Sequence, residues 1–213
     1  MTVDHASAVE TQGSLSRRDR KKRETRRTIR RVALDLALET GVESLTVEEI
    51  AEASDVSTRT FFNYFSCKEN ALVGDATLVS ADLRELIKNR PDHESPFVML
   101  REVLLESAMI GLDSADRDEV YARQRLVHEN PALLPRQLAY YAAIEKMLAE
   151  GIAERFEVNT NIDMRPALLA TIIASAMRVA IQRWVVDESQ SLNQLVESAF
   201  DQIERHELVT NSW

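Results

Sequence analysis

The segment TVEEIAEASDVSTRTFFNYFSCK, residues 46–68, predicts two short helices joined by a tight turn and followed by the start of a third. Thr46 and Glu49 have the spacing of a capping box, which begins a helix by satisfying two backbone N–H groups. The run 54–56 then interrupts the helical pattern, since Asp55 tolerates turn and left-handed conformations. A helix, a short turn and a second helix is the arrangement that seats the second helix against DNA.

The second helix is expected over residues 58–65, with Ser57 as its cap. Phe61 and Phe65 are four residues apart, so they share one face, which we assign to the core. The spacing of Ser66 and Glu69 predicts a further capping box, which would place Lys68 in the first turn of the next helix. A cation there opposes the helix dipole, so we interpret Lys68 as the partner of an anion such as a phosphate.

From about Thr28 to Leu72 the chain resembles the DNA-binding domain of the TetR family of bacterial repressors. The family pattern is an apolar helix, a glycine, T-x-x-x-I-A, a small residue, a turn, and V-S-x-x-T-aromatic-x-x-Y-F-x-x-K-E. The matching residues are Ala33, Leu36, Gly41, Thr46, Ile50, Ala51, Val56, Ser57, Thr60, Phe61, Tyr64, Phe65, Lys68 and Glu69. Two positions depart from the pattern: Asp55 replaces the usual turn glycine, and Phe62 replaces a tyrosine that commonly touches phosphate.

The formal net charge of −9 is unevenly distributed along the chain. Residues 17–31 carry ten Arg or Lys against Asp19 and Glu24, a net charge of +8, whereas residues 71–213 carry 14 basic and 23 acidic side chains. Basic charge beside a helix-turn-helix is the electrostatic footprint of a protein that binds a phosphate backbone. The alternative is a solvated basic tail.

Three regions are expected. Residues 1–16 form a disordered tail, residues 17–70 form the DNA-binding domain with its basic flank, and residues 71–213 form a helical body for effector binding and dimerisation. A first helix is marked by the apolar stripe Ile29, Val32, Ala33, Leu36 and Ala37 and ends before Gly41.

The rest of the chain shows helical periodicity and no sustained strand alternation, so the fold class is all-α with about nine helices, three of them in the head. One helix is expected from Ser66 to about Asn89, and Ser95 is expected to cap the next one at Pro96. The later segments are 96–112, 115–128, 132–156, 165–187 and 192–208.

The last two helices are unusually apolar. The penultimate one is apolar on more than one face, as burial on two sides requires. The family resemblance implies that this pair meets its symmetry mate in a four-helix dimer bundle. The candidate interface residues are Ile173, Ala176, Ala180, Leu192, Leu195, Val196 and Phe200. A purely intrachain core is the alternative.

The body also carries large, adaptable apolar side chains with a few polar tips, which suit a ligand cavity between helices. The candidates are Phe97, Met109, Tyr121, Arg123, Tyr140, Tyr141, Met177 and Trp184, and the alternative for each is ordinary core. The segment RQRLVHENPALL, residues 123–134, resembles a stretch of actinobacterial members thought to bind acyl-CoA-like effectors. Arg123, Arg125 and His128 are then candidates for an anionic head group, and an exposed helix face is the alternative.

Other classes of function find little support. The histidines are scattered without metal-ligand spacing, and no glycine-rich phosphate loop or nucleophile elbow is present, so we expect neither an enzyme nor a cofactor or metal. No apolar run approaches 18 residues and the N-terminus has no hydrophobic signal region, which predicts a cytoplasmic protein without a membrane partner. A single cysteine, Cys67, excludes an intrachain disulfide.

These features predict a homodimeric, ligand-responsive transcriptional regulator, interpreted as a repressor of a nearby operon that a small apolar or amphipathic effector releases from a palindromic operator. Thr58, Arg59 and Asn63 are the candidates for base edges. The candidates for other DNA contacts are Thr46, Ser57, Thr60, Tyr64, Lys68, Arg26, Arg27 and Arg30. The alternatives are an activator, a nonspecific DNA-binding protein, or a helical small-molecule-binding module without DNA binding.

Overall fold

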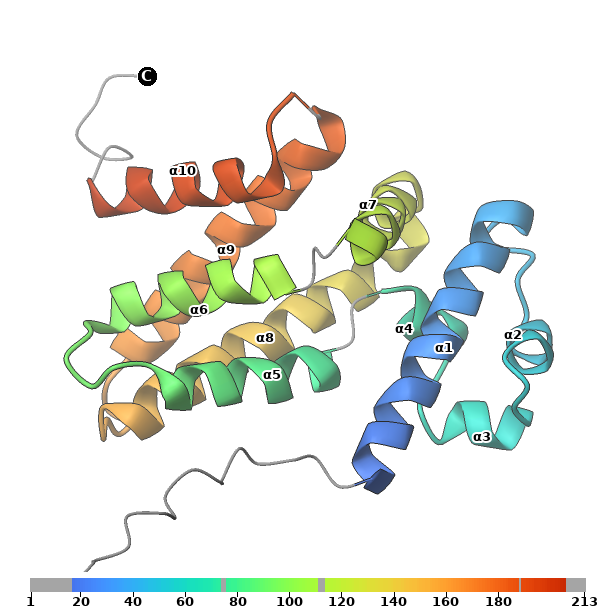
Figure 1. Cartoon of the computed structure of the whole chain (residues 1–213), viewed down its shortest axis with the longest axis horizontal. Helices are drawn as coiled ribbons and strands as arrows, with labels where there is room; N and C mark the ends of the chain where they lie inside the picture. The colour runs from blue at the N-terminus through green and yellow to red at the C-terminus, as the bar shows by residue number, and fades with distance from the viewer. Residues whose placement is uncertain (1–16, 74–75, 111–113, 188, 206–213) are drawn as a thin grey trace, which may run out of the picture.

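The structure is a computed structural model that describes residues 17–73, 76–110, 114–187 and 189–205. A small head and a larger body lie side by side along its long axis (Figure 1). The head contains α1 (Arg17–Thr40), α2 (Val47–Ala53), α3 (Thr58–Phe62) and α4 (Lys68–Leu72). The body contains α5 (Ala76–Asn89), α6 (Pro96–Ile110), α7 (Ser114–Glu129), the 3₁₀ turn η1 (Pro131–Leu133), α8 (Leu134–Arg155), α9 (Arg165–Val186) and α10 (Leu192–Glu204).

The prediction of an all-α fold is confirmed, with ten α-helices and no strand among the described residues. The extra helix arises because the expected helix from Ser66 to Asn89 is divided into α4 and α5. Val73 follows α4 in an extended conformation, with ψ of 174°, which stops the helical path. The expected disorder of residues 1–16 lies outside the described residues.

Several local predictions in the head are confirmed. Thr46 and Glu49 form the reciprocal capping box that begins α2. Asp55 adopts a left-handed φ of +53°, so this residue takes the conformation for which the family usually uses glycine. Gly41 ends α1 with a φ of +86°, and its N–H donates to the carbonyl of Ala37.

Two local predictions are wrong. Ser66 does not cap α4: the N-cap is Cys67, which makes no side-chain capping bond, while the Ser66 hydroxyl accepts a hydrogen bond from the amide of Asn70. The second helix ends at Phe62 rather than Phe65, and Asn63 becomes its C-cap. A tight turn follows, in which the N–H groups of Tyr64 and Phe65 both donate to the carbonyl of Phe61.

The head has its own hydrophobic core, and this core extends to residues of the body. Side chains from all four head helices fill it, including Ile29, Ile50, Phe61 and Leu72, and each of these is completely buried. Leu126 of α7 and Leu133 of η1 belong to the same buried cluster. The boundary between the two regions is therefore a packed contact as well as a chain connection.

The body is built around α9, which packs against α8 on one side and α10 on another, while α6 runs beside α10 and contacts both α9 and α10 (Figure 1). One face of α9 is buried in this core through Ala170, Ile173, Ala180 and Trp184. By length and composition alone, α9 is also the one described helix that could cross a membrane. One face of α9 packs between α8 and α10, and another face is exposed.

Candidate DNA-binding surface and effector-binding body

The exposed face of α3 is the base-reading candidate. Thr58, Arg59 and Asn63 are all exposed on it, as a reader of base edges must be. The opposite face is fixed by Phe61 and Phe65, whose rings lie 5.6 Å apart in the head core. A short helix that buries two aromatic rings on one side presents its other side to solvent in a set orientation.

Phe62, which replaces a tyrosine of the family pattern, places an exposed apolar ring on this surface. Its ring is 55% exposed on the face that also carries Thr58, Arg59 and Asn63. The ring of Phe61 contacts the ring of Phe62 edge to face, with 5.6 Å between ring centroids and 89° between ring planes. The helix thus presents an oriented apolar group among polar ones, and the thymine methyl is the apolar group in the major groove.

The hydroxyl groups around this face serve first as helix caps. The Thr46 hydroxyl donates to the Glu49 carboxylate at 2.7 Å and accepts from the Glu49 N–H at 3.2 Å. The Thr46 hydroxyl and N–H both donate to this carboxylate and lower the pKa of Glu49, with a smaller contribution from the charge of Lys68. Ser57 caps α3 through the N–H of Thr60, and their hydroxyl oxygens lie 2.8 Å apart. Tyr64 is half-buried.

Lys68 has partners inside the protein. Its ammonium group donates to the carbonyls of Val42, Glu43 and Leu45 at 2.9, 3.1 and 2.6 Å. An ammonium group has three N–H donors, and these three contacts use all of them. Lys68 therefore ties the start of α4 to the loop between α1 and α2. Its expected contact with phosphate stays a prediction that requires one of these bonds to be exchanged.

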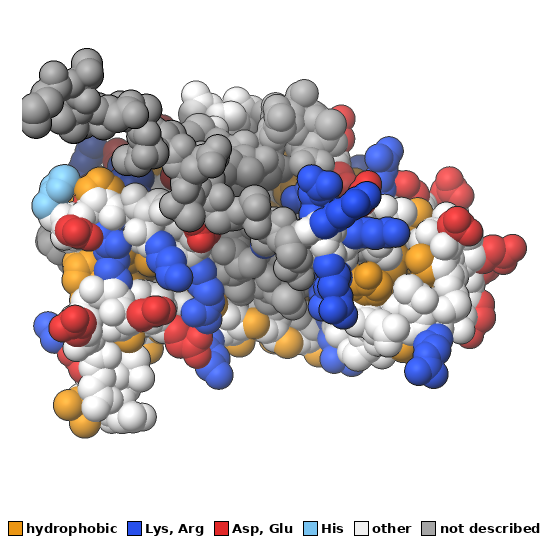
Figure 2. Space-filling model, turned by 60° about the horizontal axis from the view of Figure 1, so that its bottom comes forward, with side chains coloured by type: hydrophobic (Ala, Val, Ile, Leu, Met, Phe, Trp, Pro, Cys, Tyr) orange, Lys and Arg blue, Asp and Glu red, His pale blue; other side chains and the backbone are white. Residues whose placement is uncertain are grey.

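The basic run is helical and forms the N-terminal part of α1. Its start and α3 lie at the same end of the head (Figure 1), and blue side chains gather over this region in Figure 2. Arg27 is exposed, whereas Arg26 lies over the ring of Phe65 at 5.0 Å and Arg30 donates to the carbonyl of Val73 at 3.4 Å. The other exposed basic residues of the run are Arg17, Arg18, Arg20, Lys21, Lys22 and Arg31.

Arg123 lies at the junction of head and body and is only 5% exposed. Its guanidinium group donates to the carbonyls of Ala71 and Leu72 in α4 and of Arg30 in α1, and it pairs with Glu119 at 2.7 Å. Burial lowers the pKa of Arg123 to about 10, with a smaller lowering from the charge of Arg30. The side chain remains charged at neutral pH and is neither on an exposed helix face nor in the body core.

Most of the remaining effector candidates lie in or against the body core. Trp184 is 2% exposed and meets Tyr121 edge to face at 5.3 Å. Phe97, Tyr140 and Met177 are partly buried against the same core. The Tyr141 hydroxyl oxygen accepts a hydrogen bond from the side-chain amide of Gln137 at 2.5 Å, and the Tyr141 ring lies under Arg178. Burial raises the pKa of Tyr141. The side chain of Met109 lies outside the described residues.

The predicted dimer residues lie inside a single chain. The side chains of Ile173, Ala176, Ala180, Leu192, Val196 and Phe200 are buried in the body core, and Leu195 is half-buried against it. Within one chain they pack as the intrachain alternative expects, and their contact with a second copy stays a prediction. The helix α9 is apolar on more than one face, and α8 and α10 cover one face and leave another exposed. The exposed face carries Leu168, Ile172, Val179 and Val186.

Comparison with known proteins agrees with this geometry. Residues 29–72 match the family described as bacterial regulatory proteins, tetR family, and residues 94–207 match the MftR C-terminal domain. The chain belongs to the TetR family. It is 32% identical over 208 residues to the HTH-type transcriptional regulator TcmR of Streptomyces glaucescens, an alignment that covers 94% of this chain and 92% of TcmR.

Two solved structures share the fold. The FadR repressor of Thermus thermophilus, in complex with lauroyl-CoA, is 23% identical with a TM-score of 0.55, over 88% of this chain and 97% of that one. The fatty acid degradation regulator FadR of Bacillus halodurans is 20% identical with a TM-score of 0.50, over 84% and 94% of the two chains. This TetR-family chain is thus a ligand-responsive, DNA-binding transcriptional regulator, of a family whose members are generally cytoplasmic.

Proposed function

We propose that two copies of the chain bind a palindromic operator, with one α3 in each of two major grooves on the same side of the DNA. Thr58, Arg59 and Asn63 read base edges, and Arg59 is suited to a bidentate contact with guanine. Support comes from the polar, exposed face of α3, which the buried rings of Phe61 and Phe65 hold in place. The phosphates are contacted by the hydroxyls of Thr46, Ser57, Thr60 and Tyr64 and by Arg26, Arg27 and Arg30 of α1.

The second copy packs against the exposed face of α9. Leu168, Ile172, Val179 and Val186 are each between 47% and 70% exposed. With Ser175 and Gln182, these positions alternate in steps of four and three residues, which is the seam along which two helices pack. A twofold axis across this seam would join two identical heads, as a palindromic operator requires.

The effector is an amphipathic molecule with an acyl chain, and it binds in the body near Tyr121, Tyr140 and Trp184. These side chains combine apolar surface with polar tips, the composition that such ligands require. The Thermus FadR that shares this fold was crystallised with lauroyl-CoA. Effector binding shifts the population of dimers away from the head spacing that fits the operator, which releases a nearby operon from repression.

The base-reading role is tested by Arg59→Ala, with Arg27→Ala as the matched control because both arginines are exposed. We expect Arg59→Ala to weaken operator binding by about 1–3 kcal/mol and to relax the preference at one base pair in each half-site. Arg27→Ala should weaken binding to all sequences equally. Fluorescence anisotropy on a set of single-base operator variants separates these outcomes, and equal losses on every sequence for Arg59→Ala would assign it to the backbone.

The effector role is tested with lauroyl-CoA as the probe and free CoA as its control. The chain contains two tryptophans, and Trp213→Phe leaves Trp184 as the single reporter in the body core. Lauroyl-CoA should change the Trp184 emission in a saturable way and release labelled operator over the same concentration range, while CoA alone should do neither. Operator release without an emission change would place the effector elsewhere.

A further inference from the structure

Helix α7 belongs to both cores of the molecule. Tyr121 points to the body, where its ring meets Trp184 of α9 at 5.3 Å. Leu126, little more than one turn further on, is 5% exposed within the head core. Arg123 lies between them in sequence and contacts the head. Helix α7 therefore touches the region of the proposed effector and the DNA-binding head within six residues.

The contacts of Arg123 join three helices. One terminal nitrogen, Nη1, donates to the carbonyls of Ala71 at 3.0 Å and Leu72 at 2.8 Å, at the end of α4. The other, Nη2, donates to the carbonyl of Arg30 in α1 at 3.3 Å and to Glu119 of α7 at 2.7 Å. The last carbonyls of a helix have no partners within it and carry its negative partial charge, so a cation satisfies them well.

The hydrogen bonds of Arg123 restrict rotation of the head relative to the body, which the apolar contacts at the same junction do not. Leu126 and Leu133 supply attraction between head and body, but burial of apolar surface is non-directional and tolerates rotation. A planar guanidinium group bonded to carbonyls on two other helices tolerates little rotation, because each N–H must point at its acceptor. The orientation of the head relative to the body therefore depends mainly on Arg123, whereas the attachment of the head depends mainly on the apolar contacts.

We propose that Arg123 is a positioning residue that fixes the angle between head and body, and thereby sets the half-site spacing that the dimer accepts. It touches neither the operator nor the reading face of α3. It acts through α4 and α1, which pack against each other, and α1 in turn packs against α2. This inference rests on the homodimer proposed above, because a spacing is defined only for two joined heads.

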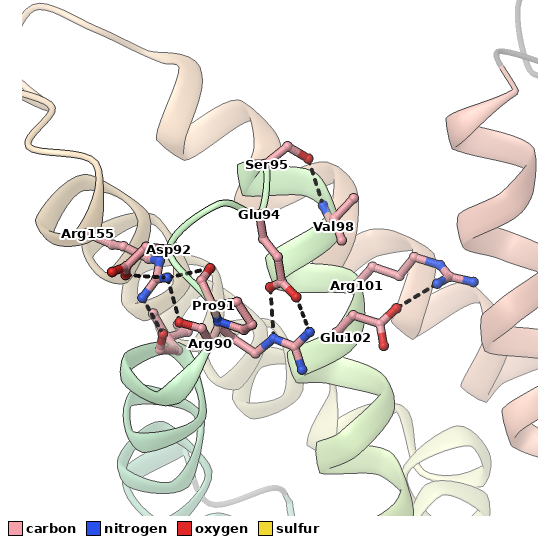
Figure 3. Close-up of polar contacts among 10 residues, drawn as sticks. Arg90, Pro91, Asp92, Glu94, Ser95, Val98, Arg101, Glu102 and Arg155 are labelled. Carbon is pink, nitrogen blue, oxygen red and sulfur yellow. Dashed lines mark hydrogen bonds and ion pairs between the residues drawn. The ribbon is translucent and has the colours of Figure 1, made fainter.

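The chain offers a matched control in Arg155, at the end of the body where α5 meets α6 (Figure 3). Its guanidinium group donates to the carbonyls of Ile87, Arg90 and Pro91 at 3.1, 2.7 and 2.8 Å, and its side chain is 13% exposed. Arg155 is thus a second, mostly buried arginine that bonds to the carbonyls at a helix end. Its contacts are within the body, so its loss costs comparable hydrogen bonds without touching the head.

The experiment uses the full chain and a series of operators in which the half-sites stand at the native spacing or are moved by one or two base pairs. The variants are Arg123→Met, Arg123→Lys and Arg155→Met, and binding is measured to each operator and to a single half-site. Lysine keeps the charge but presents its donors from one atom, so it cannot span α4 and α1 as arginine does. If Arg123→Met loses its helical circular dichroism, Arg123→Lys decides the result.

We expect the Arg123 variants to retain half-site affinity while their preference for the native spacing falls by about fivefold or more, the range of a coupling free energy between sites. Arg155→Met should keep the wild-type preference at a lower melting temperature. An unchanged spacing preference in the Arg123 variants, or an equal loss of that preference in Arg155→Met, would overturn this inference and leave the proposed homodimer standing. A wild-type protein that ignores spacing would overturn the proposed homodimer and this inference with it.

Discussion

Replacement of Lys68 by methionine should destabilise the protein rather than remove a phosphate contact. The ammonium group donates to three carbonyls of the loop between α1 and α2. Those of Val42 and Leu45 belong to buried residues, 6% and 2% exposed, and have little access to replacement water. At about 1–1.5 kcal/mol for each acceptor left without its donor, and nothing for the exposed Glu43, the loss is about 2–3 kcal/mol. For a chain of this size that is roughly 4–12 °C in melting temperature.

Two measurements separate this role from a phosphate contact. Thermal unfolding reports the stability loss, and the dependence of operator affinity on salt reports the number of phosphates contacted, at a slope of about 0.9 for each. Lys68→Met should lower the melting temperature and leave the slope unchanged. Arg27→Met, on an exposed side chain of the basic run, should do the reverse. Unchanged stability with a slope reduced by about 1.8 for two copies would refute the structural assignment of Lys68.

Three further outcomes follow from the same geometry. Ile172→Glu should raise the dimer dissociation constant at least about thirtyfold, because roughly 1 kcal/mol of burial is lost on each side of the twofold axis. Analytical ultracentrifugation checks this against Leu38→Glu, which alters a similarly exposed residue of α1 and should stay dimeric. The lowered pKa of Glu49 means that its contribution to stability is present above pH 4.5 and is lost as the pH falls through the native pKa, so Glu49→Gln should reduce the loss of melting temperature between pH 7 and pH 3; an equal loss in both proteins would contradict this. Phe62→Ala should weaken operator binding about fivefold and abolish any effect of replacing operator thymines by uracils, and an effect that persists in the variant would exclude a methyl contact by Phe62.

The features that could be predicted from the sequence are those that depend on neighbouring residues. The capping box of Thr46 and Glu49, the left-handed Asp55 and the helix end at Gly41 each involve residues within four positions of one another. The wrong prediction of a cap at Ser66 also concerns neighbouring residues, but contacts with a distant part of the chain lie beside it. Lys68, two residues later, is held by carbonyls more than twenty residues earlier in the chain, and helix α4 begins at this lysine.

The features that could not be predicted depend on which surfaces meet. The apolar pattern of α9 is compatible with burial of either face, and only the packing of α8 and α10 shows that Ile173 is covered and Ile172 is exposed. The acceptors of Arg123 are backbone carbonyls, which every residue has, so nothing in the sequence marks Ala71, Leu72 and Arg30 as its partners. From the sequence alone, Arg123 is therefore compatible with a ligand for an external anion or with an exposed helix face, and no residue pattern indicates its contact with the head.

Helix α3 is proposed to read a specific sequence twice, once for each subunit of a dimer. Footprinting of the wild-type protein on the DNA upstream of its own gene and of neighbouring genes, in the presence of excess competitor DNA, tests this most directly. We expect a short protected site with twofold symmetry, and loss of that protection in Arg59→Ala at concentrations that saturate the wild type. Protection that spreads without sequence preference, or that survives Arg59→Ala unchanged, would contradict it.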